Sequence, residues 1–370
     1  MTAASSPIQS PRLRRLLRDL IDIYSPSGKE EEVLEFIHNY LKDQGLPVVL
    51  QEVDDNRYNI LVLPRSDAEV RLAMIGHVDT VAAYDLEHYE SEEQGDRIIG
   101  LGAADMKSGC AAMIEAFVTL WENGGADTPA ALALVVGEEE EGDGTLKLVK
   151  DFYFPRALIG EPTDLQPCLS HYGYVEVQLN TEGKRVHASL ANQGRNPIEN
   201  MLRLLLKLTH YMVTDRPEIV YNIRELSNSQ AGFAVPEACE AWLDLHLPPT
   251  APLGEITLEI EEILMREHEE NPEFNGSLRF TTIHAGYELP EKGPMVSSLK
   301  TIFANQALPW EPKAFRSHSD ANLLWAAGTK PILLGPGQLE KAHTRDEDVS
   351  YQQVLTASRI YYDILKGLSA

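Results

Sequence analysis

The apolar positions near the start of the chain follow a helical period. In the first predicted helix they are Leu13, Leu16, Leu17, Leu20 and Ile21. The segment Ser25–Gly28, with the sequence Ser-Pro-Ser-Gly, interrupts this pattern. A second predicted helix follows and places on one face Val33, Leu34, Ile37 and Leu41. Because Ser27 and Glu30 have the spacing of a capping box, we expect their side chains to cap this second helix.

Further along, short apolar runs alternate with helical stretches. The runs that predict buried strands are Ile60–Leu63, Leu72–Ile75, Leu132–Val136, Ala157–Ile159 and Pro331–Leu334. Helices are predicted at Met106–Trp121 and Val349–Leu365. This alternation is typical of an α/β fold, in which helices cover a mixed or parallel sheet.

The pattern changes between residues 175 and 285. The segment Val175–Leu179 alternates strictly, as a half-buried strand does. The predicted order is strand, helix, strand, strand, helix, strand, at residues 175–179, 197–212, 220–223, 241–247, 253–268 and 278–282. That order is the split βαβ arrangement of a ferredoxin-like α+β unit. We therefore predict an α/β domain at 1–174 and 286–370, interrupted by a second domain at 175–285.

Composition and charge narrow the functional class. The chain has 370 residues, 43% of them hydrophobic and 24% charged, which is ordinary for a globular enzyme of two domains. Its 32 basic and 57 acidic residues give a net charge of −25. This charge repels phosphate backbones and anionic lipid surfaces, so we expect neither nucleic acid nor a membrane as a partner.

Cysteine usage points to a reducing compartment. Cys110, Cys168 and Cys239 lie far apart, which suggests neither a disulfide framework nor a thiolate zinc site. The sequence up to Arg18 has no apolar signal-peptide region, and no stretch reaches the ~18 apolar residues of a membrane span. We expect a cytoplasmic protein.

Groups that can bind metal follow the predicted strands. The run Leu72–Ile75 leads into His77 and Asp79. In an extended H-x-D segment the two side chains share a face, so the Asp79 carboxylate can accept the second ring N–H of His77 and orient it for a metal. For an H-x-D motif taken alone, the commoner alternative is a histidine at the surface or one that is hydrogen-bonded within the core.

Further carboxylates occupy similar positions. Asp105 lies on a glycine-rich turn before a predicted helix, where the alternative is an N-cap role. The acidic run Glu138–Glu141 directly follows a buried strand, and its carboxylates repel one another unless a cation or solvent offsets them. Glu161 follows a third strand, and His343 follows the last. Two histidines and several carboxylates without a thiolate predict a site for one or two zinc-type ions.

Five segments together carry a family resemblance. They read G-H-V-D-T-V from Gly76, G-L-G-A-A-D-M-K-S-G from Gly100, G-E-E-E from Gly137, I-G-E-P-T-D-L from Ile159 and G-P-G-Q-L-E-K-A-H from Gly335. In this order and at these distances the chain resembles, from Leu13 to Leu365, the co-catalytic zinc amidohydrolases. That family includes acetylornithine deacetylase, succinyl-diaminopimelate desuccinylase, acetyl-lysine deacetylase and carboxypeptidase G.

The resemblance implies a zinc-exopeptidase-like catalytic domain with two Zn²⁺ per chain, and with Co²⁺ as an alternative metal. It implies that Asp105 bridges the two ions, that His77 and Glu161 complete one, and that Glu139 and His343 complete the other. Glu138 would then be the general base, and Asp79 would orient His77. A shift of one residue within the acidic run would instead select Glu139 and Glu140.

The same resemblance makes residues 175–285 a lid and dimerisation domain, and so implies a homodimer. His187, within Gly183–Ser189, matches the histidine that reaches the active site of the partner subunit; the alternative is a surface histidine on a turn. His246 stands where relatives commonly carry an arginine. Arg316 and Ser319 match positions that touch the amino-acid part of the substrate, although Ser319 can also cap a helix.

The sequence thus predicts hydrolysis of the amide bond of an N-acyl amino acid, with acetylated ornithine or lysine and succinylated diaminopimelate as leading substrates. A dipeptidase or carboxypeptidase of the same family is the first alternative. A non-catalytic binding protein on the same scaffold is the second.

Overall fold

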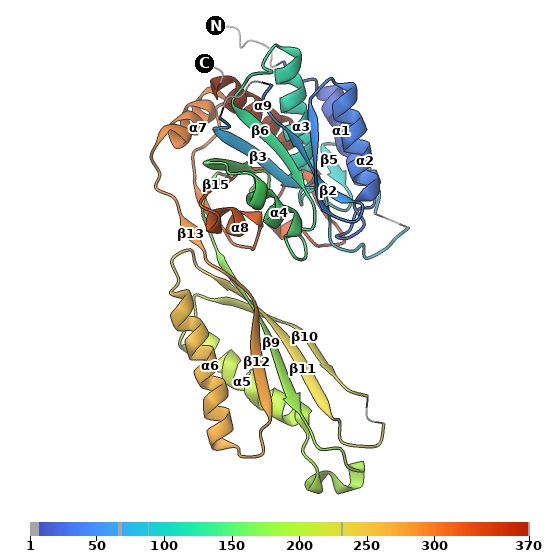
Figure 1. Ribbon diagram of the computed structural model, residues 1–370, viewed down its shortest axis with the longest axis vertical. Coiled ribbons are helices and arrows are strands. Elements are labelled where there is room, and N and C mark those ends of the chain that lie inside the picture. Colours follow the sequence, from blue (N-terminus) through green and yellow to red (C-terminus); the bar gives the residue numbers. More distant parts are fainter. Residues whose placement is uncertain (1–6, 66–68, 88, 231, 369–370) are drawn as a thin grey trace. The chain divides into compact units, whose positions relative to one another are not determined.

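A computed structural model describes residues 7–65, 69–87, 89–230 and 232–368 (Figure 1). The chain forms two compact units. The first comprises Met1–Leu169, Leu289–Phe315 and Ser319–Ala370. The second comprises Ser170–Glu288 and Arg316–His318. No helix in the described part of the chain is long and apolar enough to cross a membrane.

The first unit is built on a mixed sheet with the strand order β1-β2-β6-β3-β7-β15-β8. The strands are β1 (Val48–Asp54), β2 (Arg57–Val62), β3 (Leu72–His77), β6 (Ala130–Val135), β7 (Arg156–Ile159), β15 (Lys330–Leu333) and β8 (Cys168–His171). The short strand β14 (Lys313–Phe315) pairs with β8, and β13 (Tyr287–Glu288) pairs with β8 where β8 continues into the second unit.

The centre of this sheet is parallel. β6, β3, β7 and β15 are neighbours that all run in the same direction. Their residues are almost entirely buried, as expected for strands covered on both faces. Because the carboxyl ends of parallel strands lie at one edge of a sheet, the loops after these four strands meet there. The predicted fold class, an α/β domain with a mixed sheet, is confirmed.

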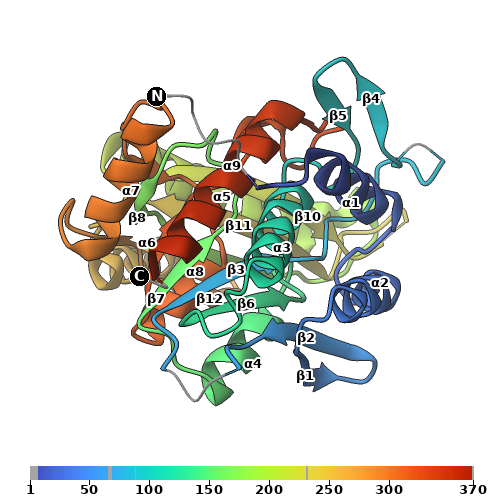
Figure 2. The same ribbon diagram turned by 90° about the horizontal axis from the view of Figure 1, so that it is seen from above.

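Helices cover both faces of the sheet. They are α1 (Ser10–Asp22), α2 (Glu31–Asp43), α3 (Lys107–Glu122), α4 (Asp143–Asp151), α7 (Pro294–Asn305), α8 (Asp320–Ala326) and α9 (Tyr351–Leu368). The helix α3 packs on β3 and β6 and contacts α1 and α9. Figure 2 shows α3 and α9 on one side of the sheet and α4 on the other, where α4 packs against α8.

A close approach between backbones fixes the start of α3. A Cβ atom added to Gly109 would lie only 2.2 Å from the carbonyl oxygen of Gly160. Only glycine therefore lets the first turn of α3 lie against the end of β7. This contact brings the turn before α3, which carries Asp105, next to the loop that carries Glu161.

A second, smaller sheet completes the first unit. Its strand order is β16 (Asp348–Ser350), β5 (Arg97–Ile99) and β4 (Glu92–Gln94). The antiparallel pairing joins Asp348 to Ile99 and Ser350 to Arg97. This pairing joins the segment after His343 to the segment before Asp105.

The predicted capping box at the second helix is wrong. The helix α2 begins at Glu31, and its N-cap residue Glu30 makes no side-chain cap bond. The Glu30 carboxylate instead accepts hydrogen bonds from the Arg57 guanidinium at 3.0 Å. The Ser27 hydroxyl donates to Oδ2 of Asp79 at 2.7 Å. Both side chains thus take tertiary partners that local spacing does not reveal.

The second unit has the topology of a ferredoxin-like fold. Its elements are β9 (Gly173–Glu182), the 3₁₀ helix Ala188–Gln193, α5 (Pro197–Thr214), β10 (Val220–Asn228), β11 (Ala238–Leu247), α6 (Leu253–Glu270) and β12 (Gly276–His284). The sheet order is β10-β11-β9-β12, and all three pairings are antiparallel. Alternate residues of β9, including Val175, Val177 and Leu179, form its core with apolar residues of α5 and α6.

The second unit also contains a group of histidines. Nδ1 of His284 lies 2.8 Å from Nε2 of His318, and the two rings stack. The Tyr174 ring lies 5.0 Å from that of His318 and 5.4 Å from that of His246. Burial lowers the pKa of His171 to about 4 and that of His318 to about 3, and the neighbouring histidines add to both shifts. These rings are neutral in the folded protein at pH 7.

Acid is expected to destabilise the second unit. A histidine whose folded-state pKa is depressed contributes stability that is complete above its unfolded pKa of 6.5 and is lost as the pH falls toward the folded value. For the fully buried His171, lowering the pH from 7.5 to 5 should cost about 2 kcal/mol of unfolding free energy. Denaturant unfolding of the whole chain at a series of pH values measures this loss.

The variant His171→Gln is the control for this prediction, because it removes the titrating ring. Its unfolding free energy should fall less between pH 7.5 and 5 than that of the wild type. Equal losses in the two proteins would contradict the assignment to His171.

Candidate functional site

The loops at the carboxyl edge of the first unit's sheet bring together a buried group of acids around His77. His77 is the last residue of β3 and is 1% exposed. Its Nε2 atom lies 3.2 Å from Oδ1 of Asp105, 3.7 Å from Oε2 of Glu138 and 3.9 Å from Oε1 of Glu161. His77, Asp105 and Glu161 have the separations of a metal-binding group.

A second group shares Asp105 with the first. Nε2 of His343 lies 2.9 Å from Oε2 of Glu139 and 3.6 Å from Oδ2 of Asp105. Asp105, Glu139 and His343 also have the separations of a metal-binding group, as do His77, Glu138 and Glu139. One oxygen of Asp105 therefore faces His77 and the other faces His343. The helix α3 has its N-cap at Met106, so Asp105 is not a helix cap.

Within the acidic run only the first two side chains point inward. The side chains of Glu138 and Glu139 are 9% and 6% exposed, whereas Glu140 and Glu141 lie at the surface. Gly137 and Gly142, both with a positive φ, bound the turn, and the amide of Gly142 donates to the carbonyl of Gly137 at 2.7 Å. The turn directs the run out of the site after Glu139.

Asp79 contacts this turn as well as His77. Its carboxylate accepts hydrogen bonds from the backbone amides of Glu138 at 3.3 Å and Glu139 at 3.1 Å. Nδ1 of His77 lies 3.1 Å from the backbone oxygen of Asp79 and 3.6 Å from its carboxylate. The carbonyl is therefore the closer partner of the imidazole, because the Asp79 side chain turns toward the amides of the glutamate loop and the Ser27 hydroxyl.

Burial and mutual repulsion raise the pKa of several acids in this site. The pKa of Glu138 and that of Glu161 lie well above the ordinary value, mainly because both groups are buried and then because other carboxylates are near. Burial also raises the pKa of Glu139, against the hydrogen bond from His343. Burial acts to lower the pKa of His77, but the charge of Glu138 and the bonds to Asp105 and Asp79 outweigh it and raise that pKa well above 6.5.

The residues present fit a divalent metal centre. Oε1 of Glu161 is buried and makes no hydrogen bond within the described chain. Four carboxylates face inward, and only two imidazoles lie among them. Negative charge without a positive partner is costly to bury, so bound cations would stabilise this group. Nitrogen and oxygen donors without a thiolate suit zinc-type ions. His77, Asp105, Glu139, Glu161 and His343 are the side chains that could hold them.

The remaining predicted residues lie elsewhere in the chain. His187 is an exposed residue of the second unit whose ring accepts the amide of Ser189, so it caps the 3₁₀ helix that follows. His246 lies on β11, and its buried Nδ1 has no hydrogen-bond partner among described residues. Arg316 is exposed, with its guanidinium 5.9 Å from the Tyr172 ring. Ser319 is fully buried and caps α8 through a capping box with Asn322.

The sequence interpretation missed a buried glutamate next to the site. Glu347 is 3% exposed, and its carboxylate accepts hydrogen bonds from the backbone next to Asp105. The available signal was its position four residues after His343 and two residues before Val349, where the predicted last helix begins. An acid at that position is ordinarily solvent-exposed, so the pattern gave no reason to select it.

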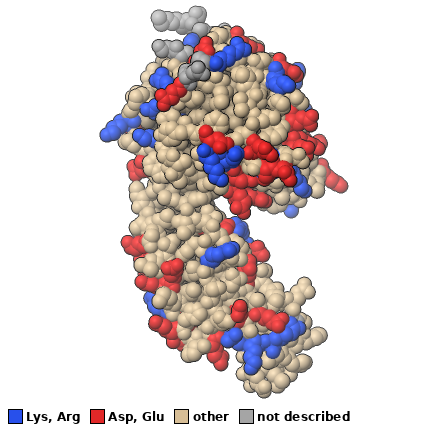
Figure 3. Space-filling model, viewed as in Figure 1, with Lys and Arg blue, Asp and Glu red and all other residues tan. Residues whose placement is uncertain are grey.

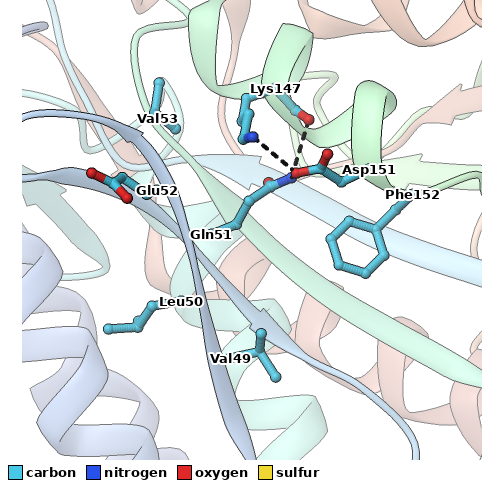
Figure 4. A pocket seen from close by; sticks show the side chains of 8 residues that line it. All are labelled: Val49, Leu50, Gln51, Glu52, Val53, Lys147, Asp151 and Phe152. Atoms are coloured by element: carbon cyan, nitrogen blue, oxygen red, sulfur yellow. Dashed lines mark hydrogen bonds and ion pairs between the residues drawn. The ribbon is translucent and has the colours of Figure 1, made fainter.

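The surface of the first unit has two further features. Figure 3 shows acidic side chains gathered on the visible face of the first unit, in line with the net charge of −25. An open groove of about 530 Å³ runs beside the edge strand β1 (Figure 4). Its polar groups bond one another, since Gln51 donates to the Asp151 carboxylate at 2.7 Å and Lys147 pairs with Asp151 at 3.1 Å. We assign the groove no function.

Comparison with known proteins decides the family. The model of peptidase family M20/M25/M40 matches residues 73–367, which span both units and every residue of the two metal-binding groups. The chain belongs to this family. Acetylornithine deacetylases are similar to this chain in sequence, and a dinuclear metal-binding peptidase of the M20 family is similar to it in fold. The protein is therefore a metal-dependent amidohydrolase. Both metal-binding groups are complete, so no observation favours the alternative of a non-catalytic binding protein.

Individual relatives match more than nine-tenths of the chain. An acetylornithine deacetylase of Edwardsiella ictaluri is 26% identical over 376 residues, covering 92% of this chain and 94% of the relative. A tripeptidase from Staphylococcus aureus has a TM-score of 0.80 at 19% identity, covering 98% of this chain and 99% of its own. The YXEP protein of Bacillus subtilis, a dinuclear metal-binding peptidase, has a TM-score of 0.71 at 11% identity, covering 96% and 97%. The two structures share the fold.

Proposed function

We propose that this M20 enzyme is a deacylase that hydrolyses the amide bond of an N-acyl amino acid, with N-acetylornithine, N-acetyl-lysine and N-succinyl-diaminopimelate as leading substrates. The observation that carries the chemistry is the pair of metal-binding groups that share Asp105, with the buried carboxylate of Glu138 beside them. The choice of a deacylase rests on the acetylornithine deacetylase relatives, which cover 86% to 93% of this chain. We expect the enzyme to be cytoplasmic.

We assign His77, Asp105 and Glu161 to one Zn²⁺ and Asp105, Glu139 and His343 to the other, with Co²⁺ as an alternative metal. Ions held by these residues would polarise the scissile carbonyl and make a water molecule more acidic. Because each group contains Asp105, loss of that carboxylate affects both sites. Asp79 holds the loop of Glu138 and Glu139 through its amide contacts, in addition to its contact with His77.

Glu138 is assigned as the general base. Oε2 of Glu138 faces Nε2 of His77 at 3.7 Å, so the carboxylate borders the metal-binding groups. Burial raises the pKa of Glu138, which brings the carboxylate closer to the basicity that proton transfer near neutral pH requires. Glu138 takes a proton from the attacking water and delivers it to the nitrogen of the leaving amine as the amide bond breaks.

A substrate panel tests the proposed reaction. N-acetyl and N-succinyl amino acids should be turned over with a higher kcat/KM than dipeptides and C-terminal peptide bonds, in assays with added Zn²⁺ or Co²⁺. Faster cleavage of dipeptides would make the protein an exopeptidase, the alternative that the peptidases of similar fold favour. Hydrolysis of neither class would contradict the proposed function.

We further propose that the second unit is a lid and that it forms a homodimer. Exposed apolar side chains support this. Leu202, Leu206 and Val213 share one face of α5 and are 46%, 69% and 62% exposed. β10, the next element along the chain, is an edge strand that also exposes Val220 and Leu226. An unpaired edge strand and an apolar helix face are each suited to association with a second copy.

The variant Leu206→Glu is expected to be monomeric, because it places a charge in the centre of this surface. Leu258→Glu is the matched control, since Leu258 is exposed to 54% on α6. Light scattering after size exclusion should give a dimer for the wild type and the control and a monomer for Leu206→Glu. A wild type that is monomeric, or three proteins of the same mass, would contradict this interface.

His187 is proposed to act in the active site of the partner subunit, where it would donate a hydrogen bond to the oxyanion of the transition state. Oxyanion donors are typically worth ~10²–10³-fold in kcat. His187→Ala should therefore lose about that much activity while it retains its metals.

Mixed dimers of His187→Ala and Glu138→Gln subunits should regain activity, because one of their two sites combines an intact base with an intact His187. Mixed dimers that stay as inactive as both parents would contradict a shared site.

His246, Arg316 and Ser319 are proposed to contact the amino-acid part of the substrate. Because the Ser319 hydroxyl is buried and caps α8, its contribution would be to position the start of that helix.

A further inference from the structure

A buried carboxylate holds the loop that presents Asp105. Oε1 of Glu347 accepts hydrogen bonds from the backbone amides of Ala104 at 2.9 Å and Asp105 at 3.0 Å. Oε2 of the same group accepts from the amide of Gly102 at 3.0 Å. Three amides of one turn therefore converge on a single side chain that is 3% exposed.

The backbone of Glu347 contacts the same loop. Its carbonyl oxygen accepts the amide of Gly100 at 3.0 Å. Immediately afterwards β16 pairs with β5, with Asp348 opposite Ile99. Glu347 thus lies between the segment of His343 and the segment of Asp105 and bonds to the loop from both its main chain and its side chain.

This arrangement is specific to a carboxylate. Hydrogen bonds from amides to an ionised acceptor are about twice as strong as bonds between neutral groups, and both oxygens of a carboxylate accept. A glutamine at this position has one acceptor oxygen, and its NH₂ group would face an amide that also donates. Removal of the side chain would leave three amides without acceptors in a buried turn, which is costly.

We propose that Glu347 is a positioning residue for the metal centre: it fixes the turn Gly102–Asp105 so that one oxygen of Asp105 faces His77 and the other faces His343. The observed distances of 3.2 Å and 3.6 Å describe that orientation. A turn without this anchor samples other orientations of Asp105, and the ions then bind to a less organised site. The inference rests on the proposed role of Asp105 as a shared ligand.

The test measures the affinity for Zn²⁺ directly. Metal-free wild type, Glu347→Gln and Glu347→Ala are titrated with Zn²⁺ in competition with a chromophoric chelator. Because partners that orient a ligand typically contribute 10–100-fold to metal affinity, both variants should bind Zn²⁺ about 10–100-fold more weakly. The loss should be larger in Glu347→Ala. Hydrogen exchange of the segment 100–106 should be faster in both variants.

A matched control separates positioning from stability. Glu115 is a buried glutamate of α3 that accepts the amide of Gln9 at 2.9 Å and pairs with Arg12 at 2.7 Å, away from the metal-binding groups. Glu115→Gln should lower the unfolding midpoint and leave the affinity for Zn²⁺ unchanged. Should Glu347→Ala fail to fold, the isosteric Glu347→Gln still decides the question, because its shape is preserved.

Folded Glu347 variants that bind Zn²⁺ as tightly as the wild type, with lower midpoints like that of Glu115→Gln, would overturn the inference and leave the proposed function intact. A wild-type protein that binds no Zn²⁺ would overturn both. Weakened binding in the Glu347 variants and unchanged binding in the control establish the positioning role.

Discussion

Replacement of Glu138 by glutamine is expected to lower kcat by about 10²–10⁴-fold, the usual contribution of a general base. Glutamine preserves the size of the side chain and cannot accept the proton of the attacking water. Since Glu138 is not among the five proposed ligands, the variant should retain its metal. The measurement pairs kcat for the best substrate of the panel with metal content from elemental analysis.

Two neighbouring variants serve as controls for this prediction. Glu139→Gln should weaken metal binding, because Glu139 lies 2.9 Å from His343 within a metal-binding group. Glu140→Gln should behave as the wild type, because Glu140 lies at the surface. If Glu138→Gln loses metal while Glu139→Gln keeps it and loses turnover, the two roles are exchanged and the assignment is wrong by one residue.

Replacement of Asp105 by asparagine is expected to remove metal from both groups at once. Its two carboxylate oxygens face different histidines. An asparagine offers one neutral carbonyl oxygen, and its NH₂ group only donates, so one of the two positions loses its ligand. The loss of affinity should exceed the 10–100-fold that is typical of residues that only orient a ligand, and activity should fall with it. Metal titration of the apoprotein measures the number of ions bound and their affinities.

Asp244→Asn is a suitable control for Asp105→Asn. Asp244 is a buried carboxylate of the second unit that accepts the hydroxyl of Tyr174 at 3.0 Å. Its substitution should destabilise the second unit without changing the metal content. Retention of both ions at wild-type affinity in Asp105→Asn would show that Asp105 is not shared between them.

The sequence was sufficient to predict the central strands of the first unit, the order of the elements in the second unit and the candidate residues after the strands. Buried strands such as β3 and β6 are short apolar runs, and the alternation along β9 predicts a sheet with one buried face. The polar residues directly after those runs lie together because parallel strands end at the same edge. His77, the run Glu138–Glu141 and Glu161 could therefore be selected as candidates from their positions after the strands. The family resemblance then picked out Glu138 and Glu139 within the run and implied the role of each residue.

The features that the sequence did not predict depend on partners distant in the chain. Ser27 has the spacing of a helix cap, yet its hydroxyl donates to Asp79, because a charged acceptor forms the stronger bond. Glu347 resembles a surface acid until β16 and β5 bring it against the loop of Asp105. The histidine group of the second unit likewise assembles from strands and from the segment around His318. Such contacts are properties of the fold, not of local pattern.

Elemental analysis combined with an activity assay tests the central claim most directly. The purified protein should contain about two divalent ions per chain, lose both ions and its activity on treatment with a strong chelator, and recover activity when Zn²⁺ or Co²⁺ is restored. Full activity in a protein that carries no metal, or activity unchanged by complete removal of the ions, would contradict the two-metal site built on Asp105.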